Sequence, residues 1–285
     1  GLVAVLIHLP TLQNEFVYDD FPAVVENPIV NGESPDTSWT EVFTSHYWGK
    51  RPGFENVNMW RPLTTLTFVF NARVFGMEPA SFHALNLVLH GLVTAFVVFL
   101  FQAWFGKIGV SAVAGALFAV MPVHVEAVAS VANRTELLAA VFYLAGLTAW
   151  IRARQLGDRV KFYCLSLMCL ALGLLAKEHC ITLPCAVLVY ELYRRLGNLK
   201  IEYRRPPTWV LSSLIGVIAF YFWARGVAFS SAFDWQVPLA DNPLANENLS
   251  TRILTAGSLF FRYLQLLIVP VQLSADYSAH AIPLV

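Results

Sequence analysis

Ionisable side chains lie beside apolar runs at several places in this sequence, where they could take part in group-transfer chemistry. The first place is "FVYDDFP", in which Asp19 and Asp20 follow a short apolar run at the start of the chain. Adjacent residues do not share a helix face, so the two carboxylates are expected to point in different directions. One of them could face a substrate as a general base. A turn before Pro22 explains the pair equally well, and Asp20 could serve that turn while Asp19 does chemistry.

The second place is "PVHVEAVASVANRTELLA", which carries His124, Glu126 and Arg134. In helical projection Glu126 and Arg134 fall near the same face. A carboxylate and a guanidinium at that position could bind a polar substrate, or they could simply pair with each other as a salt bridge.

Two further cations are candidates for binding an anion. Lys177 and Glu178 lie in "LLAKEHC" between two apolar runs with almost no loop, and lysine is a point-charge ligand for phosphate. A lysine that snorkels towards the membrane surface is the alternative. Arg61 precedes Pro62, which is typical of a helix start, so Arg61 could reach an anion or anchor an interfacial helix together with Trp60.

The histidines of "FHALNLVLH" are a different case. His83, Asn86 and His90 are spaced to lie on one helix face, but no acidic residue stands at metal-ligand spacing beside them. The sequence therefore predicts packing or hydrogen bonding here, and it indicates neither a metal site nor a resident cofactor.

The composition decides what kind of protein must position these groups. The chain is 57% hydrophobic and 13% charged, whereas a soluble domain is about 45–50% apolar and about 25% charged. This predicts an integral membrane protein. The formal net charge is zero, and nothing suggests nucleic-acid binding. The four cysteines show neither metal-ligand spacing nor a disulfide framework.

The apolar runs predict an all-α, polytopic transmembrane helix bundle. The run 82–105 is long enough to cross a bilayer alone. Runs of about 15 residues reach only about 22 Å, so their helices must continue through polar residues at their ends. Those residues would lie at membrane depth, where ionisable groups are functional candidates. The stretch 253–271, which contains Arg262, could span or lie in the interface. The shorter runs are 108–123, 137–151, 162–176, 180–193 and 208–223.

The distribution of lysine and arginine predicts the orientation. The loops near 152–161 and 194–205 are strongly basic, and Lys107 lies in a third short loop. Alternation of the spans places all three on one side, which should be cytoplasmic. The acidic loop 13–80 then lies on the opposite face. Because the chain begins inside an apolar run and stops without a tail, we expect a fragment of a longer protein with a truncated first span.

Several strings together resemble one family. These are "FVYDDFPAVVENP", "WRPLTTLTF", "FHALNLVLH", "PVHVEAVASVANRTELLA", "AKEHCITLP" and "LSADYSAHAIPLV". They are similar, in the right order and over nearly the whole chain, to the transmembrane-and-tetratricopeptide-repeat proteins. Those are transmembrane O-mannosyltransferases that target cadherins, with bacterial relatives.

The resemblance implies a C-type membrane glycosyltransferase fold with interfacial helices in the external loops. Residues 1–285 would form the membrane-embedded domain, 13–80 the first external loop and 225–285 a second polar or amphipathic region; the family's C-terminal repeats are not in this sequence. The implied donor is a polyprenyl-phosphate sugar, dolichyl-phosphate mannose in particular, and the implied acceptor is a Ser or Thr hydroxyl of a protein. Transfer would occur on the luminal face of the endoplasmic reticulum, or on the periplasmic face of a bacterial inner membrane.

With that reaction, the candidate residues receive roles. Asp19 is the expected general base, with Asp20 as the alternative. Lys177, Arg134 and Arg61 would bind the donor phosphate. Two functions of other kinds stay open as alternatives: a non-catalytic membrane scaffold and a transporter of a lipid-linked substrate. The groups expected to bind sugar or to orient the cations are Glu126, Glu178 and His124.

Overall fold

The computed structural model describes residues 1–34, 39–49, 59–196, 205–229, 244 and 247–271. Every regular element in these residues is helical, which confirms the predicted all-α class. The elements are α1 (Leu2–Ile7), η1 (Leu9–Gln13), η2 (Phe21–Val25), α2 (Pro28–Asn31), α3 (Trp39–Thr44), α4 (Pro62–Phe75), α5 (Pro79–Phe105), α6 (Ile108–Val120), η3 (Pro122–His124), α7 (Val125–Ala129), α8 (Arg134–Gln155), α9 (Val160–Ala176), η4 (Glu178–Thr182), α10 (Leu183–Leu196), α11 (Thr208–Phe229) and α12 (Leu249–Ile268).

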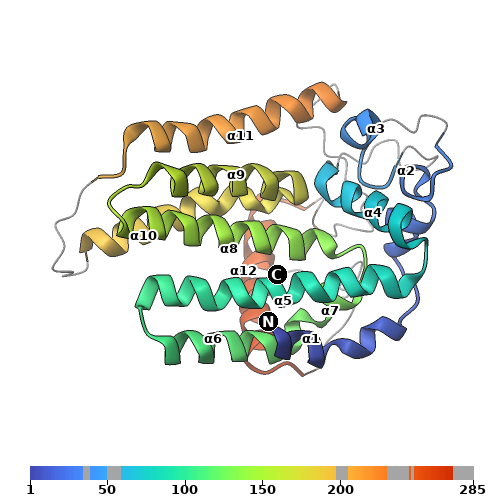
Figure 1. Ribbon diagram of the computed structural model, residues 1–285, viewed down its shortest axis with the longest axis horizontal. Helices are drawn as coiled ribbons and strands as arrows, with labels where there is room; N and C mark the ends of the chain where they lie inside the picture. The colour runs from blue at the N-terminus through green and yellow to red at the C-terminus, as the bar shows by residue number, and fades with distance from the viewer. Residues whose placement is uncertain (35–38, 50–58, 197–204, 230–243, 245–246, 272–285) are drawn as a thin grey trace.

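Helices α5, α6, α8, α9, α10 and α11 pack beside one another and run along the long axis of the molecule (Figure 1). α8 packs against α5 and α9, α5 also packs against α6, and α11 packs against α9. Within the described residues, α5, α8 and α11 are long and apolar enough to cross a membrane, and α6 with the bent segment that follows would make a fourth span. This agrees with a membrane helix bundle.

The ends of the helices agree with the length argument made from the sequence. α8 extends beyond the apolar run 137–151 at both ends and takes in charged residues there. The apolar run 180–193 is not one helix, because the short 3-10 helix η4 precedes α10. α12 contains most of the stretch 253–271, whose membrane placement was left open. It does not qualify as a span by length and composition, and it runs across the direction of the bundle helices (Figure 1).

The alternating directions of the helices separate two ends of the bundle. The connections after α5 and α8 and the last turn of α10, all of which carry basic residues, lie at one end (Figure 1). The short helices α2, α3 and α4 gather at the other end, together with the start of α8. The assignment of the basic end to the cytoplasm stays a prediction from the distribution of lysine and arginine.

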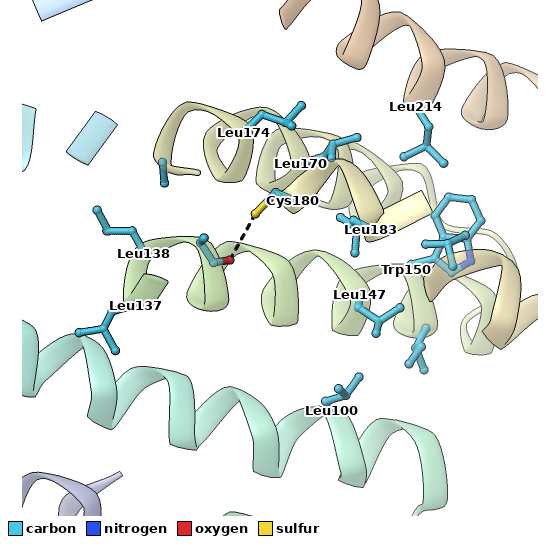
Figure 2. Close-up of a cluster of buried hydrophobic side chains, with 14 of the residues drawn as sticks. Leu100, Leu137, Leu138, Leu147, Trp150, Leu170, Leu174, Cys180, Leu183 and Leu214 are labelled. Carbon is cyan, nitrogen blue, oxygen red and sulfur yellow. Dashed lines mark hydrogen bonds between the residues drawn. The ribbon is translucent and has the colours of Figure 1, made fainter. Parts of the chain in front are cut away.

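Small residues let the central helices approach closely. A Cβ added at Gly146 of α8 would lie 3.0 Å from a methyl carbon of Leu183, and one added at Gly173 of α9 would lie 2.8 Å from Sγ of Cys180. In a membrane, where lipid is as apolar as leucine, helices associate through such close packing. Figure 2 shows the resulting core, in which the Cys180 thiol donates a hydrogen bond to the carbonyl of Ala139 at 3.7 Å.

Candidate functional site

A pocket of about 410 Å³ lies where α5, α6, α7, α8 and η4 meet, at the end of the bundle opposite the basic connections. Its volume is in the range typical of ligand sites, about 300–1,000 Å³. The apolar part of its wall includes Val93 and Phe118. Its polar lining residues are His90, His124, Glu126, Asn133, Glu136 and His179.

A more apolar groove of about 330 Å³ adjoins this pocket. The two hollows share Val93, Phe118, Ala140 and His179 as lining residues, so they are neighbours along one wall of the bundle. The groove alone is lined by Tyr143, Leu144 and Thr182. A molecule with a polar head and an apolar tail could therefore occupy both.

The pocket edge carries a compact set of ions. Nζ of Lys177 pairs with Oε1 of Glu136, and Nδ1 of His179 lies 3.8 Å from Oε2 of the same carboxylate. Burial lowers the pKa of His179, although the Glu136 carboxylate acts in the opposite direction. Burial also raises the pKa of Cys180 to about 12, which keeps this thiol protonated and unreactive.

The backbone between α9 and α10 explains how these groups reach the pocket. α9 ends at Ala176, and Lys177 takes an extended conformation before η4 begins. The chain therefore turns within a few residues, and consecutive side chains project towards different neighbours. Lys177 and His179 face Glu136, whereas Glu178 faces two arginines.

The carboxylate of Glu178 lies between Arg61 and Arg225. Nε of Arg61 is 3.5 Å from one oxygen, and Nη1 of Arg225 is 3.9 Å from the other. The Arg61 guanidinium also lies 5.1 Å from the ring centre of Tyr47, where a cation–π attraction holds it. Arg61 directly precedes α4, as predicted from Pro62. The predicted pair of Lys177 and Glu178 is therefore divided between two adjacent ion clusters.

The two aspartates occupy very different places. Asp20 is fully buried. Its Oδ1 accepts hydrogen bonds from the amide of Ala132 at 2.8 Å and from the hydroxyl of Ser130 at 3.2 Å, and its Oδ2 accepts one from the amide of Val17 at 3.1 Å. Asp19 is exposed. The prediction that the two carboxylates point in different directions is confirmed.

The contacts of Asp20 give it a structural task. They tie the chain before η2 to the segment between α7 and α8, more than a hundred residues away. The hydrogen bond from the Val17 amide to Oδ2 of Asp20 closes the preceding turn, in which Tyr18 has φ 46°, a left-handed conformation that side-chain-bearing residues rarely adopt. Asp20 therefore fixes the position of its exposed neighbour Asp19 relative to the segment that leads into the pocket residue Asn133.

Arg134 is also buried in a structural network. Its side chain is fully enclosed, and the guanidinium lies 4.6 Å from the ring centre of Phe68 and 5.5 Å from that of Phe82. Its donors reach Oδ1 of Asn86 at 2.9 Å, Oδ1 of Asn71 at 3.2 Å, the carbonyl of Phe82 at 3.0 Å, and the carbonyl and hydroxyl of Thr67 at 3.3 Å each.

This geometry corrects two expectations. Arg134 and Glu126 do not share a helix face, because α7 ends at Ala129 and α8 begins only at Arg134. Arg134 was also expected to bind the donor phosphate, but its five N–H groups already donate to five protein oxygens.

The other predicted residues divide as follows. His124 and Glu126 line the pocket, and Lys177 reaches its wall through Glu136. Arg61 and Glu178 pair with each other beside it. The lining residues that the sequence did not single out as site residues include Glu136, His179, His90 and Asn133.

Arg225 was also missed, although a signal was present. It stands within the apolar stretch "FYFWARGVAF", where a buried charge is costly and needs a partner. Within the described residues, no group of three or more His, Cys, Asp or Glu side chains could hold a metal ion.

Fold and site together define a class: a multi-span helical membrane protein with a polar pocket near one end and an apolar groove beside it. Comparison with known proteins narrows this class. Residues 232–285 match the family model described as "Protein O-mannosyl-transferase TMTC, DUF1736". The chain is 34% identical to Protein O-mannosyl-transferase Tmtc2 of Drosophila melanogaster over 296 residues, which cover 99% of this chain and 30% of the relative.

Two human relatives agree with this match. Protein O-mannosyl-transferase TMTC2 of Homo sapiens is 31% identical over 293 residues, covering 98% of this chain and 34% of the relative. Human TMTC1 is 37% identical over 195 residues, covering 64% of this chain and 22% of the relative. The chain spans about a third of the length of the first two relatives. No solved structure matches it. These matches confirm the resemblance read from the sequence: the chain is homologous to the TMTC family over nearly its whole length.

Proposed function

We propose that this chain forms the membrane part of a protein O-mannosyltransferase that uses a polyprenyl-phosphate sugar, dolichyl-phosphate mannose in the first place. The observation that carries the proposal is the pair of hollows with a shared wall. A polar pocket suits a sugar, and the adjoining groove suits the first units of a polyprenyl chain. The names of the homologous proteins supply the reaction class.

The reaction itself sets three requirements. The acceptor hydroxyl forms a bond to the anomeric carbon while the bond from that carbon to the phosphate oxygen breaks, and the hydroxyl proton passes to a carboxylate. Polyprenyl phosphate leaves with the electron pair. Because this phosphate is a weak base, a strong general acid is not needed, but cations must stabilise its growing charge.

The phosphate would lie where pocket and groove meet, within reach of Lys177. This amine pairs with Glu136 on the pocket wall, beside His179, which lines both hollows. Arg61 is the second candidate cation, held through Glu178. Arg134 would not contact the donor; it fixes the start of α8 by hydrogen bonds to α5.

Two carboxylates compete for the role of general base. Asp19 is held by its buried neighbour Asp20 close to the segment that leads into the pocket. Glu126 lines the pocket itself, and the side-chain amide of Asn133 donates to its Oε1 at 3.5 Å. Asp19 stays the first choice, because it is the exposed member of the pair at the end of the bundle where α2–α4 cover the helices.

Transfer from a labelled lipid-phosphate mannose to an acceptor peptide, with the full-length protein in membranes, tests the proposal. Asp19→Asn should lower turnover by about 10²–10⁴, the usual value of a general base, without loss of folded protein. Glu15→Gln changes another exposed carboxylate of the same loop and should leave turnover unchanged. Lys177→Ala should weaken donor binding.

The outcomes separate the candidates. If Glu126→Gln rather than Asp19→Asn abolishes transfer, the base is Glu126. If both variants retain full turnover, the catalytic scheme is wrong. A wild-type protein that neither binds the lipid-linked sugar nor transfers it would contradict the whole proposal and favour a scaffold.

A further inference from the structure

Three imidazoles from three separate elements meet beside the pocket. The ring of His8, which follows α1, lies edge-on to that of His90 of α5, with ring centres 4.8 Å apart. The ring of His124 is also close to that of His90, with ring centres 5.7 Å apart. His90 and His124 both line the pocket, and His8 stands behind them.

Two of these rings contain a polar atom without a partner. Nε2 of His90 and Nε2 of His124 are buried and make no hydrogen bond. The His90 side chain is only 1% exposed. Buried polar atoms are almost always hydrogen-bonded, so each exception calls for an explanation. Both residues belong to the wall of one pocket, so a molecule bound there is a candidate for the missing partner of each nitrogen.

The packing around the rings fixes their positions. Gly91 allows α1 to approach α5, because a Cβ at this position would lie 2.9 Å from a methyl group of Val5. Nδ1 of His8 donates to the carbonyl of Ala4 at 3.1 Å, which orients that ring against His90. On the other side, Phe118 of α6 lies 4.0 Å from the ring centre of His124. The imidazoles are therefore pre-positioned by apolar contacts.

The chemistry of the lining indicates what would bind. Among the described residues that line the pocket there is no lysine or arginine; the polar groups are imidazoles, carboxylates and an amide. Such a set suits uncharged hydroxyl groups, each of which donates and accepts, as a neutral imidazole also does. A phosphate would instead require the cation Lys177 at the edge of the pocket.

We infer that this pocket is a hexose subsite, and that His90, together with His124, positions the sugar by hydrogen bonds to its ring hydroxyls. The inference rests on the proposed function for the identity of the donor. It adds which part of the site contacts each part of that donor. The sugar contacts the histidine side of the pocket, the phosphate lies at Lys177, and the lipid follows the groove.

A pair of binding measurements on the purified full-length protein tests this. The probes are polyprenyl phosphate alone and polyprenyl-phosphate mannose. His90→Leu should weaken binding of the mannose-bearing lipid about tenfold, the size of one lost hydrogen bond, and leave binding of the bare lipid phosphate unchanged. His90→Gln, whose amide can take the place of Nε2, should recover most of the affinity.

His83 provides a matched control. It is a fully buried histidine of the same helix α5 and is not among the residues that line the pocket. His83→Leu should not discriminate between the two lipids, whatever it does to stability. If His90→Leu weakens both lipids equally, or neither of them, His90 only packs and the inference is wrong. If the wild-type protein binds neither lipid, the proposed function fails instead.

Discussion

α8 carries a buried arginine at each end, and the two are held in opposite ways. Arg134, the first residue of the helix, donates only to neutral oxygens of amides, carbonyls and a hydroxyl. Arg154, near the last residue, donates from Nε to Oε1 of Glu191 at 2.9 Å and from Nη2 to Oε2 at 3.3 Å, and it also pairs with Asp158. The positive charge of Arg134 is therefore spread over several neutral acceptors, whereas that of Arg154 is neutralised by carboxylates.

The helix itself sharpens this difference. The N-terminus of a helix carries partial positive charge and the C-terminus partial negative charge, so a cation is disfavoured at the position of Arg134 and favoured at that of Arg154. In the described part of the chain, no carboxylate lies within ion-pair distance of Arg134. A buried cation persists at such a place only when many well-placed acceptors and aromatic faces surround it.

The two ends of α8 therefore serve different purposes. At the basic end, the ion pairs of Arg154 with Asp158 and Glu191 hold α8 to the following loop and to α10. At the pocket end, the hydrogen bonds of Arg134 fasten α4 and α5 to the start of α8, through Thr67, Asn71, Phe82 and Asn86. That arrangement sets the geometry of the wall in which Glu136 and Asn133 lie.

Removing Arg134 should have the largest effect of any single change in α8. Arg134→Met removes a donor from five oxygens, among them the buried side-chain oxygens of Asn71 and Asn86, and a buried polar group left without a partner costs about 1–3 kcal/mol. We expect a loss of several kcal/mol, enough to prevent accumulation of folded protein. Arg134→Lys should fail too, because an ammonium cannot reproduce the planar fork of five donors. Size-exclusion chromatography of a fluorescent fusion in detergent measures the folded fraction. A normal elution profile for Arg134→Met would show that the network does not hold the pocket end.

Removing Arg154 should be costly but repairable. Arg154→Met leaves the Glu191 carboxylate buried and unpaired, at about 3–5 kcal/mol. Adding Glu191→Gln removes that charge and still accepts the hydrogen bond from Nε1 of Trp150, so the double variant should regain part of the thermal stability. At the other end, Arg134→Met combined with Asn86→Leu should regain none. Equal recovery at both ends would remove the distinction between an ionic and a neutral arginine site.

The same contrast shows how far the sequence could predict this molecule. The helical class, the separation of basic loops from the polar end, and the importance of "AKEHC" followed from hydropathy and spacing. The role of Arg134 did not, because its partners Thr67, Asn71 and Asn86 lie 48–67 residues away and are neutral residues with no pattern of their own. An arginine in a polar segment is expected to have an ionic partner, and helical spacing predicted Glu126 as the partner of Arg134. The break between α7 and α8 separates these two residues.

The aspartate pair shows a second limit of the same kind. Sequence reasoning predicted that the two carboxylates point in different directions, and it left open which of them serves the turn. Only the distant contacts with Ser130 and Ala132 identify Asp20 as the buried one. His90 was expected to pack or to form hydrogen bonds. Its ring packs against His8 and Phe118, but its place in a pocket wall depends on the approach of α1 and α6, which no local spacing in the sequence indicates.

Acidification should produce the smallest effect, and of the two arginine sites in α8 it should act only on that of Arg154. Although burial alone would raise it, hydrogen bonds from the Tyr163 hydroxyl and Arg154 lower the pKa of Asp158 below its usual range. Its contribution to stability is therefore present above the unfolded-state pKa of about 3.9 and is lost as the pH falls through the lower pKa of the folded state. One partly exposed, charge-assisted contact corresponds to roughly 1 kcal/mol.

Thermal unfolding of the purified protein between pH 6 and pH 3 measures this loss. Asp158→Asn keeps the left-handed backbone at this position, which asparagine tolerates, and should flatten the response, whereas Glu33→Gln, an exposed carboxylate near the other end, should not. The acceptors of Arg134 are neutral throughout this range, so the network at the pocket end has no corresponding titration. If Asp158→Asn has the pH response of the wild-type protein, the acid-sensitive charge lies elsewhere, and the ionic character assigned to the Arg154 end is not what distinguishes it from the Arg134 end.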